Sequence, residues 1–400
     1  MRSHRVILLA ATLLAAVTSL SVGAAPAAAA PSKAAGNMAN ACSSFPQSGF
    51  ATCFAKVRTD IRALTASQAA APLATVAGLG PAQLQSAYKL PSATAGSGQT
   101  IAIVDAFDDP TAEADLGTYR SQFGIPACTT ANGCFRKVNQ NGAASPLPSV
   151  DSGWALEISL DLDMVSAICP NCHILLVEAS SNSFANLGTA VNRAATMGAN
   201  AISNSYGGGD QRENSSSPYN HPGIAVTASS GDNGFGVSYP ASSKFVTGVG
   251  GTSLTTASNA RGWSETAWNG AGSGCSRFQT QITGQANANT GCRRRAVADV
   301  SAVADPNTGV AVFDSTPFNN RSGWFVVGGT SASAPIIAGV FGLAGNAASI
   351  NNNFPYSHTS SLFDVTSGSN GSCNPSQLCT ARAGWDGPTG LGTPNGTGAF

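Results

Sequence analysis

Short apolar runs alternate with longer apolar or amphipathic stretches through the middle of the chain. The short runs have the length of buried strands and are bounded by glycine or polar residues. Three longer stretches, at about 152–168, 183–197 and 331–345, have the length of helices. This alternation predicts an α/β domain with a mainly parallel central sheet. The predicted buried strands are residues 99–105, 173–178, 199–203, 223–228, 245–249 and 324–327.

The N-terminal part of the chain does not follow this pattern. Residues 1–30 have a basic start, an apolar stretch and an alanine-rich end, which are typical of a secretory signal peptide. A retained membrane anchor is the alternative, and no later segment is apolar enough to span a bilayer. We expect a secreted, extracellular protein with a short N-terminal extension or pro-segment at 31–82 and one domain at 83–400. Weak periodicity at 55–64 predicts a helix within the extension.

Composition narrows the possible functions. Lys and Arg equal Asp and Glu at 20 each, so the chain lacks the basic surface of a nucleic-acid-binding protein. Charged residues are only 10% of the chain, against a usual ~25%. Hydrophobic residues at 42% are ample for a core and exclude a disordered chain. Residues 255–295 and 346–400 are rich in Gly, Asn and Ser and are predicted to be long surface loops.

Ten cysteines fall into five close pairs along the chain. An even number in an exported protein favours disulfides, and pairing between neighbours is the simplest arrangement. Zinc is the alternative at Cys169 and Cys172, which have ligand spacing, but no second C-x-x-C motif completes a four-ligand set. The expected pairs are Cys42/Cys53, Cys128/Cys134, Cys169/Cys172, Cys275/Cys292 and Cys373/Cys379.

A candidate nucleophile, Ser331, lies in the motif Gly-Gly-Thr-Ser-Ala-Ser-Ala-Pro at 328–335. This motif joins a predicted strand to an apolar helix, so the serine would lie in the positive field of the helix N-terminus beside free backbone N–H groups. That position can activate a hydroxyl and offer one donor to an oxyanion. The alternative is that Thr330 or Ser331 only caps the helix.

Two acidic residues in the predicted helix at 152–168 are a candidate source of a catalytic base. Glu157 and Asp161 are four residues apart and share one helix face. Two close carboxyls cannot both ionise cheaply, so one keeps its proton at a raised pKa. Such a pair can accept a proton from a serine in acid. The alternative is a solvated acidic face that also includes Asp163.

A third acidic residue, Asp232, follows the predicted strand at 223–228 in the sequence Ser-Ser-Gly-Asp-Asn-Gly. A protonated carboxyl there could donate a hydrogen bond to a developing oxyanion, whereas an ionised carboxylate would repel it. An Asx-turn after the strand explains the same residue without any catalytic role.

Taken together, these motifs resemble those of the sedolisins, the serine-carboxyl peptidases of the subtilisin-like superfamily. Similar sequence extends over most of 81–396, and the order Glu, Asp, Asp, Ser is kept. The resemblance implies a subtilisin-like three-layer fold and hydrolysis of peptide bonds in proteins at acidic pH. Ser331 would be the nucleophile and Glu157 its base, with Asp161 hydrogen-bonded to Glu157. Asp232 would hold the oxyanion together with the Ser331 N–H.

The resemblance also implies a substrate-binding segment at Ser205, Tyr206 and Gly207, which would line the channel and pair with peptide backbone. Tyr206 stands where the family usually has Trp. By the same resemblance, Asp105 would support the end of its strand. The implied partners are protein or peptide substrates, with no nucleic acid and no membrane, and we expect a monomer.

One structural Ca²⁺ is implied near the C-terminus. The sedolisin calcium site is similar to the sequence around Asp364 and Asp386, which would give carboxylates. Val365, Arg382 and Gly384 would give backbone carbonyls.

Three alternatives remain at this stage. A subtilisin-type enzyme would use His173 or His221 as base, although no histidine has the expected sequence around it. A catalytically inactive binding protein could share the scaffold, but all four catalytic-type residues are present. An esterase is disfavoured because no Gly-x-Ser-x-Gly motif occurs. In addition, sedolisins generally carry a large folded prodomain, whereas the expected extension at 31–82 is short.

Overall fold

The computed structural model describes residue 1 and residues 37–42, 47–69 and 76–400. The predicted signal peptide at 1–30 therefore lies, apart from its first residue, outside the described part. Residues 37–400 form one compact unit. Among the helices that are described, none is both long and apolar enough to cross a membrane.

An eight-stranded sheet is the centre of this unit. Its strands run in the order β12-β11-β9-β7-β4-β6-β5, with β15 also paired to β11. Every pairing is parallel except that of β12 with β11, so the predicted mainly parallel sheet is confirmed. The strands are β4 (Thr100–Ala106), β5 (Phe135–Asn139), β6 (His173–Ala179), β7 (Ala201–Asn204), β9 (Ala225–Ser229), β11 (Thr247–Thr256), β12 (Trp263–Ala267) and β15 (Val300–Val303).

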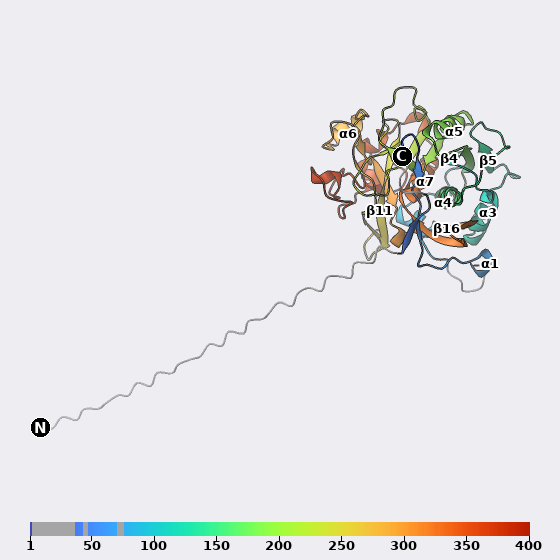
Figure 1. Ribbon diagram of the computed structural model, residues 1–400. Coiled ribbons are helices and arrows are strands. Elements are labelled where there is room, and N and C mark those ends of the chain that lie inside the picture. Colours follow the sequence, from blue (N-terminus) through green and yellow to red (C-terminus); the bar gives the residue numbers. More distant parts are fainter. Residues whose placement is uncertain (2–36, 43–46, 70–75) are drawn as a thin grey trace. The chain divides into compact units, whose positions relative to one another are not determined.

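Helices cover both faces of the sheet, as expected for the three-layer fold. The three predicted helices are present as α4 (Ser152–Ile168), α5 (Phe184–Thr196) and α7 (Thr330–Ala344). A further helix, α3 (Ala112–Gln122), packs against α4. In Figure 1, α5 lies above β4 and β5, whereas α3, α4 and α7 lie below them. Successive residues of β4 alternate between the two cores: Ile101 and Ile103 pack with α4 and α7, and Ala102 and Val104 pack with α5.

A four-stranded antiparallel sheet lies beside α4. Its order is β1 (Met38–Asn40), β3 (Lys56–Arg58), β17 (Arg321–Gly328) and β16 (Val310–Phe318). The predicted helix at 55–64 is therefore wrong, because residues 56–58 are a strand paired with β17. Ala55 and Val57 belong to the main core, so this part of the extension is folded onto the domain.

A third sheet continues from the same N-terminal segment. Its strands are β2 (Thr52–Cys53), β8 (Tyr206–Gly209) and β10 (Ser238–Tyr239), in the order β10-β8-β2. Because β2 belongs to this sheet and β3 to the previous one, Phe54 and Ala55 cross from one sheet to the other.

All five predicted disulfides are present. Cys169 and Cys172 are bonded to each other, so the zinc alternative is wrong. The C-terminal loop prediction is only partly right, because residues 385–394 have little regular structure but are buried. The remaining elements are α1 (Ala66–Ala69), α2 (Pro81–Ala87), β13 (Gly274–Cys275), α6 (Thr283–Asn287), β14 (Ala296–Val297), α8 (Phe354–Ser357), β18 (Leu362–Phe363) and β19 (Thr393–Pro394), with short 3-10 turns between them.

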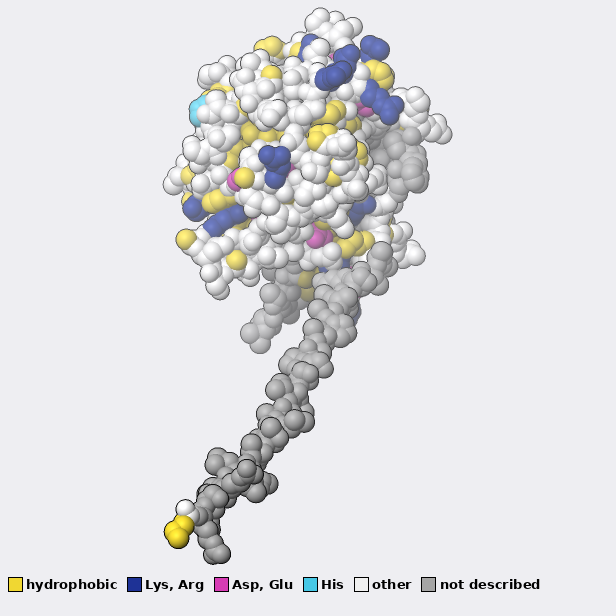
Figure 2. All heavy atoms as spheres, turned by 90° about the vertical axis from the view of Figure 1, so that its left-hand side faces the viewer, with side chains coloured by type: hydrophobic (Ala, Val, Ile, Leu, Met, Phe, Trp, Pro, Cys, Tyr) yellow, Lys and Arg dark blue, Asp and Glu magenta, His cyan; other side chains and the backbone are white. Residues whose placement is uncertain are grey.

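Charge is distributed unevenly between the interior and the surface. The face drawn in Figure 2 carries only scattered charged side chains. More than half of the 20 acidic residues are buried instead. Most of the buried acids cluster around the carboxyl ends of the parallel strands and the neighbouring helix α4, where ligand sites of such sheets are usually found.

Candidate active site

Ser331 lies at the start of α7, directly after strand β17, as the sequence predicts. It is fully buried. Its Oγ donates to the carbonyl of Ser205 at 3.2 Å and accepts from the main-chain N–H of Phe54 at 3.1 Å. Gly329 precedes the helix with a φ of 97°, and a Cβ there would lie 1.8 Å from the carbonyl oxygen of Phe54. Only glycine therefore lets the backbone of residue 54 approach the helix start.

The acidic residues of α4 are all buried, so the alternative of a solvated acidic face is wrong. Asp163 accepts from the N–H of Phe313 at 2.9 Å and has a structural contact there. Glu157 Oε2 accepts from the N–H of Ala55 at 2.8 Å, and Asp161 Oδ1 accepts from Ser205 Oγ at 2.8 Å.

Glu157 and Asp161 each keep one buried oxygen, Oε1 and Oδ2, without a hydrogen-bond partner among the described residues. Burial raises the pKa of both carboxyls well above the usual range. For Glu157, the hydroxyl of Ser331 and the N–H of Ala55 oppose that rise in pKa. Burial thus favours the uncharged form of each carboxyl, and the pair resists carrying two charges at once. The hydrogen bond expected between them stays a prediction.

Asp105 is a third carboxyl in this group. The sequence predicted it at the end of its strand, but not its place beside Glu157 and Asp161. It lies at the end of β4, is fully buried, and has no partner for either oxygen in the described structure. Burial raises its pKa to about 8. Its charge in turn raises the pKa of Glu157 and Asp161. The available signal was an acid at the carboxyl end of a central buried strand, where sites gather.

Asp232 follows strand β9 and contacts the residue before Ser331. Its Oδ1 accepts from both the N–H and the Oγ1 of Thr330 at 2.8 Å. The Asx-turn alternative is therefore wrong, since the bonded residue is far along the chain. Asp232 Oδ2 has no hydrogen-bond partner among the described residues and lies 2.7 Å from the position of a Cβ on Gly329, near the carbonyl oxygen of Phe54. Burial raises the pKa of Asp232 to about 6, although Lys56 and Thr330 oppose the rise.

The segment 205–207, predicted to bind substrate backbone, is paired with a strand from the chain's own N-terminal part. Thr52 pairs with Gly207 and Cys53 with Tyr206, both antiparallel. The ring of Phe54 follows and lies in a pocket walled by glycines. A Cβ on Gly207 would be 2.9 Å from Phe54 Cε2, and one on Gly231 would be 3.9 Å from its Cζ. Phe54 itself lines the open part of this pocket, together with Gly207, Gly208, Gly209, Ser230, Gly231, Asp232, Phe235, Val237 and Gly272, among others.

The described histidines lie away from this group. None of them hydrogen-bonds Ser331 Oγ, whose partners are given above. His173 begins β6 and is thus at the amino end of a parallel strand, opposite the site. His221 lies in a different pocket with Phe341 and Ile350, and burial lowers its pKa. These positions argue against the histidine-base alternative.

The residues expected to bind calcium lie close together in the C-terminal loops. Asp364 Oδ2 accepts from the N–H of Gly384 at 2.9 Å. Asp386 Oδ2 accepts from the N–H of Arg382 at 3.1 Å, and Asp386 Oδ1 accepts from Thr389. Burial raises the pKa of Asp386 to about 7, and the charge of Asp364 contributes. Two neighbouring acids with no cationic partner described beside them are a chemically suitable donor set for Ca²⁺.

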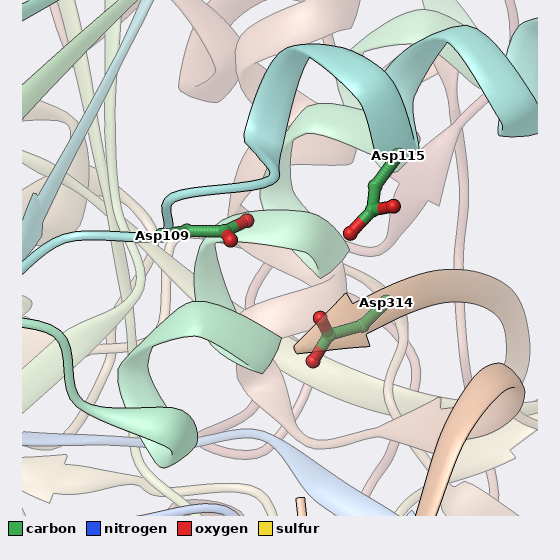
Figure 3. Close-up of side chains that lie close together, drawn as sticks. All are labelled: Asp109, Asp115 and Asp314. Carbon is green, nitrogen blue, oxygen red and sulfur yellow. The ribbon is translucent and has the colours of Figure 1, made fainter. Parts of the chain in front are cut away.

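A second acidic group, shown in Figure 3, was not predicted. Asp109 precedes α3, Asp115 lies on α3 and Asp314 on β16, and their carboxylate oxygens lie within 4.8 Å of one another. Hydroxyls fill much of their hydrogen-bonding capacity: Thr111 donates to Asp115 at 2.6 Å, and Thr316 donates to Asp109 at 3.2 Å. Burial raises the pKa of Asp109 to about 6 and that of Asp314 to about 8. Shared protons are sufficient to explain this group.

Comparison with known proteins agrees with the geometry of the site. The subtilase family profile, Peptidase_S8, matches residues 139–360. Kumamolisin from Bacillus sp. (strain MN-32) is 30% identical over 374 residues, covering 82% of this chain and 64% of kumamolisin. Sedolisin from Pseudomonas sp. (strain 101) is 33% identical over 177 residues, covering 40% of this chain and 29% of sedolisin. The chain thus spans less than two thirds of the length of these relatives.

A solved structure extends the comparison to the fold. Pseudomonas sedolisin, a serine-carboxyl proteinase complexed with two molecules of pseudo-iodotyrostatin, superposes with a TM-score of 0.66 at 25% identity. The match covers 80% of this chain and 96% of that structure. The chain therefore belongs to the subtilase family of serine-type peptidases. Within the subtilisin-like superfamily it is a member of the sedolisin family.

Proposed function

We propose that this chain is a secreted endopeptidase that hydrolyses peptide bonds of proteins in acid, with Ser331 as its nucleophile. The observation that carries this proposal is the position of one peptide group. The N–H of the Phe54–Ala55 peptide donates to Glu157, and the N–H of the peptide before it, at Phe54, donates to Ser331 Oγ. The leaving nitrogen of a substrate needs the first of these contacts, because Glu157 must return a proton to it.

In the proposed mechanism, Glu157 removes the proton from Ser331 Oγ as that oxygen attacks the scissile carbonyl. Asp161 is held by Ser205 and would be coupled to Glu157, whose charge contributes to the raised pKa of Asp161. Glu157 then gives the proton to the leaving amine, which would occupy the place of the Ala55 nitrogen. Water repeats the cycle on the acyl-enzyme.

Oxyanion stabilisation would come from protonated Asp232 and the main-chain N–H of Ser331. With a pKa of about 6, Asp232 is mostly protonated below that pH and ionised above it. Only the protonated form donates, and the ionised form would repel the oxyanion. This titration supports a working range in acid.

The segment Ser205, Tyr206 and Gly207 would pair with the backbone of a bound substrate, as it pairs with Thr52 and Cys53. Protein or peptide substrates are the implied partners, and the enzyme would act as an extracellular monomer. The predicted signal peptide and the five disulfides support export.

One Ca²⁺ would be held by the carboxylates of Asp364 and Asp386, with backbone carbonyls of Val365, Arg382 and Gly384. When bound, it would neutralise two neighbouring acids and fix the loops that carry them. The raised pKa of Asp386 supports this, because a cation would relieve the repulsion that contributes to it.

The direct test of the nucleophile is Ser331→Ala, with Ser333→Ala as the matched control two residues along α7. Ser333 Oγ only donates to carbonyls of the neighbouring strand, at 3.1 and 3.2 Å. Cleavage of an acid-unfolded protein should be lost with Ser331→Ala and kept with Ser333→Ala. If the parent chain cleaves the protein and Ser331→Ala cleaves it equally fast, the proposal is refuted.

A further inference from the structure

The N-terminal segment lies in the candidate active site as a bound substrate would. We propose that the peptide bond between Phe54 and Ala55 is the chain's own processing site, cut by Ser331. We further propose that the segment ending at Phe54 then stays bound as an inhibitor, closed by the Cys42–Cys53 disulfide. The inference rests on the proposed peptidase function and names the first substrate of the same site.

The acyl side of this bond is bound by backbone pairing and by a side-chain pocket. Thr52 and Cys53 add a strand to β8, which places Phe54 beside Ser331. Further back, the N–H of Ala51 donates to the Asn182 carbonyl at 2.8 Å, and Asn182 Nδ2 returns a bond to the Ala51 carbonyl at 2.7 Å.

The ring of Phe54 lies between Gly207 and Gly231, and only 7% of the residue is exposed. Neither glycine has a side chain to fill the space, so a large flat ring fits there. Branched side chains at these two positions would exclude such a ring. The pocket therefore selects an aromatic or other large apolar residue on the acyl side of the cut bond.

The amine side is bound by a second, independent set of contacts. The Ala55 N–H donates to Glu157, and Val57 and Lys56 then pair with Val327 and Gly328 of β17. These residues remain with the domain after cleavage. The peptide group between Phe54 and Ala55 is thus held on both sides, with its carbonyl oxygen against Gly329 at the start of α7 and its N–H on Glu157. Holding the bond in place in this way lowers the entropic cost of reaction.

The reaction needs no reagent besides water. Ser331 Oγ bonds to the Phe54 carbonyl carbon while Glu157 takes the hydroxyl proton. The bond to the Ala55 nitrogen breaks, and Glu157 returns the proton to that nitrogen, which becomes a new amino terminus. Water then hydrolyses the acyl-enzyme, frees Ser331 and leaves a carboxylate on Phe54.

The cut segment stays bound because it contacts the domain on both the acyl side and the amine side of the cleaved bond. Besides the β8 pairing of its Phe54 end, strand β1 pairs with β3, and the Ala41 N–H donates to the Ala55 carbonyl at 2.9 Å. The Cys42–Cys53 disulfide joins these two arms within the segment. Because each arm holds the other at high effective concentration, neither leaves alone. Without the disulfide, the two arms can dissociate one at a time.

The experiment follows the full-length chain in acid by intact mass and N-terminal sequencing. The parent chain should acquire a new terminus at Ala55, and Ser331→Ala should keep the bond intact. The rate should not change with protein concentration, because the bond is cut within one molecule. Phe54→Asp should slow the cut by about ten-fold or more, since a charge replaces a buried ring. Phe50→Ala is the matched control, because Phe50 is exposed, and it should cut at the parent rate.

Retention is measured by size exclusion with mass detection of the segment. The cut segment should co-elute with the domain in the parent chain and separate from it in the double variant Cys42→Ser, Cys53→Ser. Activity on an added acid-unfolded protein should rise in that double variant. Immediate separation in the parent chain would overturn the retention step.

Two failures can be told apart. If the double variant cleaves the added protein but no chain acquires a terminus at Ala55, the processing site is wrong and the peptidase proposal stands. If neither its own bond nor the added protein is cleaved by any variant at any pH, the peptidase proposal fails together with the inference.

Discussion

The main-chain N–H of Ala55 donates a hydrogen bond of 2.8 Å to Oε2 of Glu157. Glu157 is fully buried, so this is one of few donors available to its charged form. In peptide hydrolysis, the general base must later return its proton to the nitrogen of the broken bond. Glu157, the carboxyl that would act as base, therefore already contacts a peptide nitrogen. That nitrogen belongs to Ala55, the residue that follows Phe54 and its pocket.

Asp232→Asn should extend activity toward neutral pH. The pKa of Asp232 is about 6 because of its burial, so its donor is lost as the pH rises through that value. An asparagine amide donates at every pH, and the alkaline limb of the kcat profile should move upward. The measurement is kcat against pH on an acid-unfolded protein. Asp314→Asn, which changes another buried acid, should leave the limb in place. An unmoved limb in Asp232→Asn would exclude Asp232 as the donor.

Gly207→Ala should narrow the pocket that holds Phe54. A Cβ there would lie 2.3 Å from Ser238 Oγ and 2.9 Å from the phenyl ring. We expect kcat/KM for peptides with Phe on the acyl side to fall by about ten-fold or more, and that for peptides with Ala to fall less. In Gly209→Ala the new methyl meets nothing within 4 Å, and both peptides should be cleaved as by the parent. An equal loss for both peptides in Gly207→Ala would instead indicate a general distortion.

The protein should be more stable in acid than at neutral pH. Burial raises the pKa of Asp105, Asp314 and Glu178 to about 8 in the folded chain. A group with a raised folded pKa binds more protons in the native state between its two pKa values, so the free energy of unfolding falls as pH rises through that range. Tm measured by calorimetry should fall by several degrees between about pH 4 and about pH 8.

Replacing one of these acids isolates its contribution to the pH dependence of Tm. Asp314→Asn has no charge to bury, so its Tm should fall less steeply over the same interval. Asp314 Oδ1 accepts from the N–H of Thr316 at 2.7 Å, a bond that the asparagine carbonyl can keep. A Tm that rises steadily to neutral pH in the parent chain would show that these acids are ionised in the folded state.

Calcium should raise Tm through Asp364 and Asp386. A ligand that binds only the folded chain stabilises it in proportion to the logarithm of its concentration over Kd. Tm should rise by several degrees with Ca²⁺ and fall with a chelator, and Asp364→Asn should remove the response. Asp115→Asn tests the rival acidic group of Figure 3 and should leave the response intact. Loss of the response only in Asp115→Asn would move the metal to that group.

Much of the fold could be predicted because the relevant signals are local. The helix at 152–168 was predicted with its observed bounds, since an apolar-rich stretch follows Asp151, whose side chain caps the first turn. Its period then places Glu157 and Asp161 on one face without further information. The glycine and small residues before Ser331 likewise predicted the turn into α7.

Contacts between distant segments could not be predicted in the same way. Residues 56–58 form a strand because β17, some 270 residues further along, offers them an edge. The same holds for Asp105, whose carboxyl joins those of α4, and for Asp314, which meets Asp109 across more than 200 residues. The buried residues 385–394 lack a periodic pattern, because most of them pack as irregular backbone against Val300 and its neighbours and only 393–394 form a short strand, β19.

The central claim is that a carboxylate, rather than a histidine, activates Ser331. The most direct measurement is kcat for Glu157→Gln from about pH 3 to about pH 9, beside Asp163→Asn, which changes a buried acid of the same helix that contacts Phe313. Removal of a general base costs about 10²- to 10⁴-fold, and we predict a loss of that order for Glu157→Gln at every pH. Asp163→Asn should keep the parent profile if it folds. Undiminished activity of Glu157→Gln, with a maximum near neutral pH, would contradict the account.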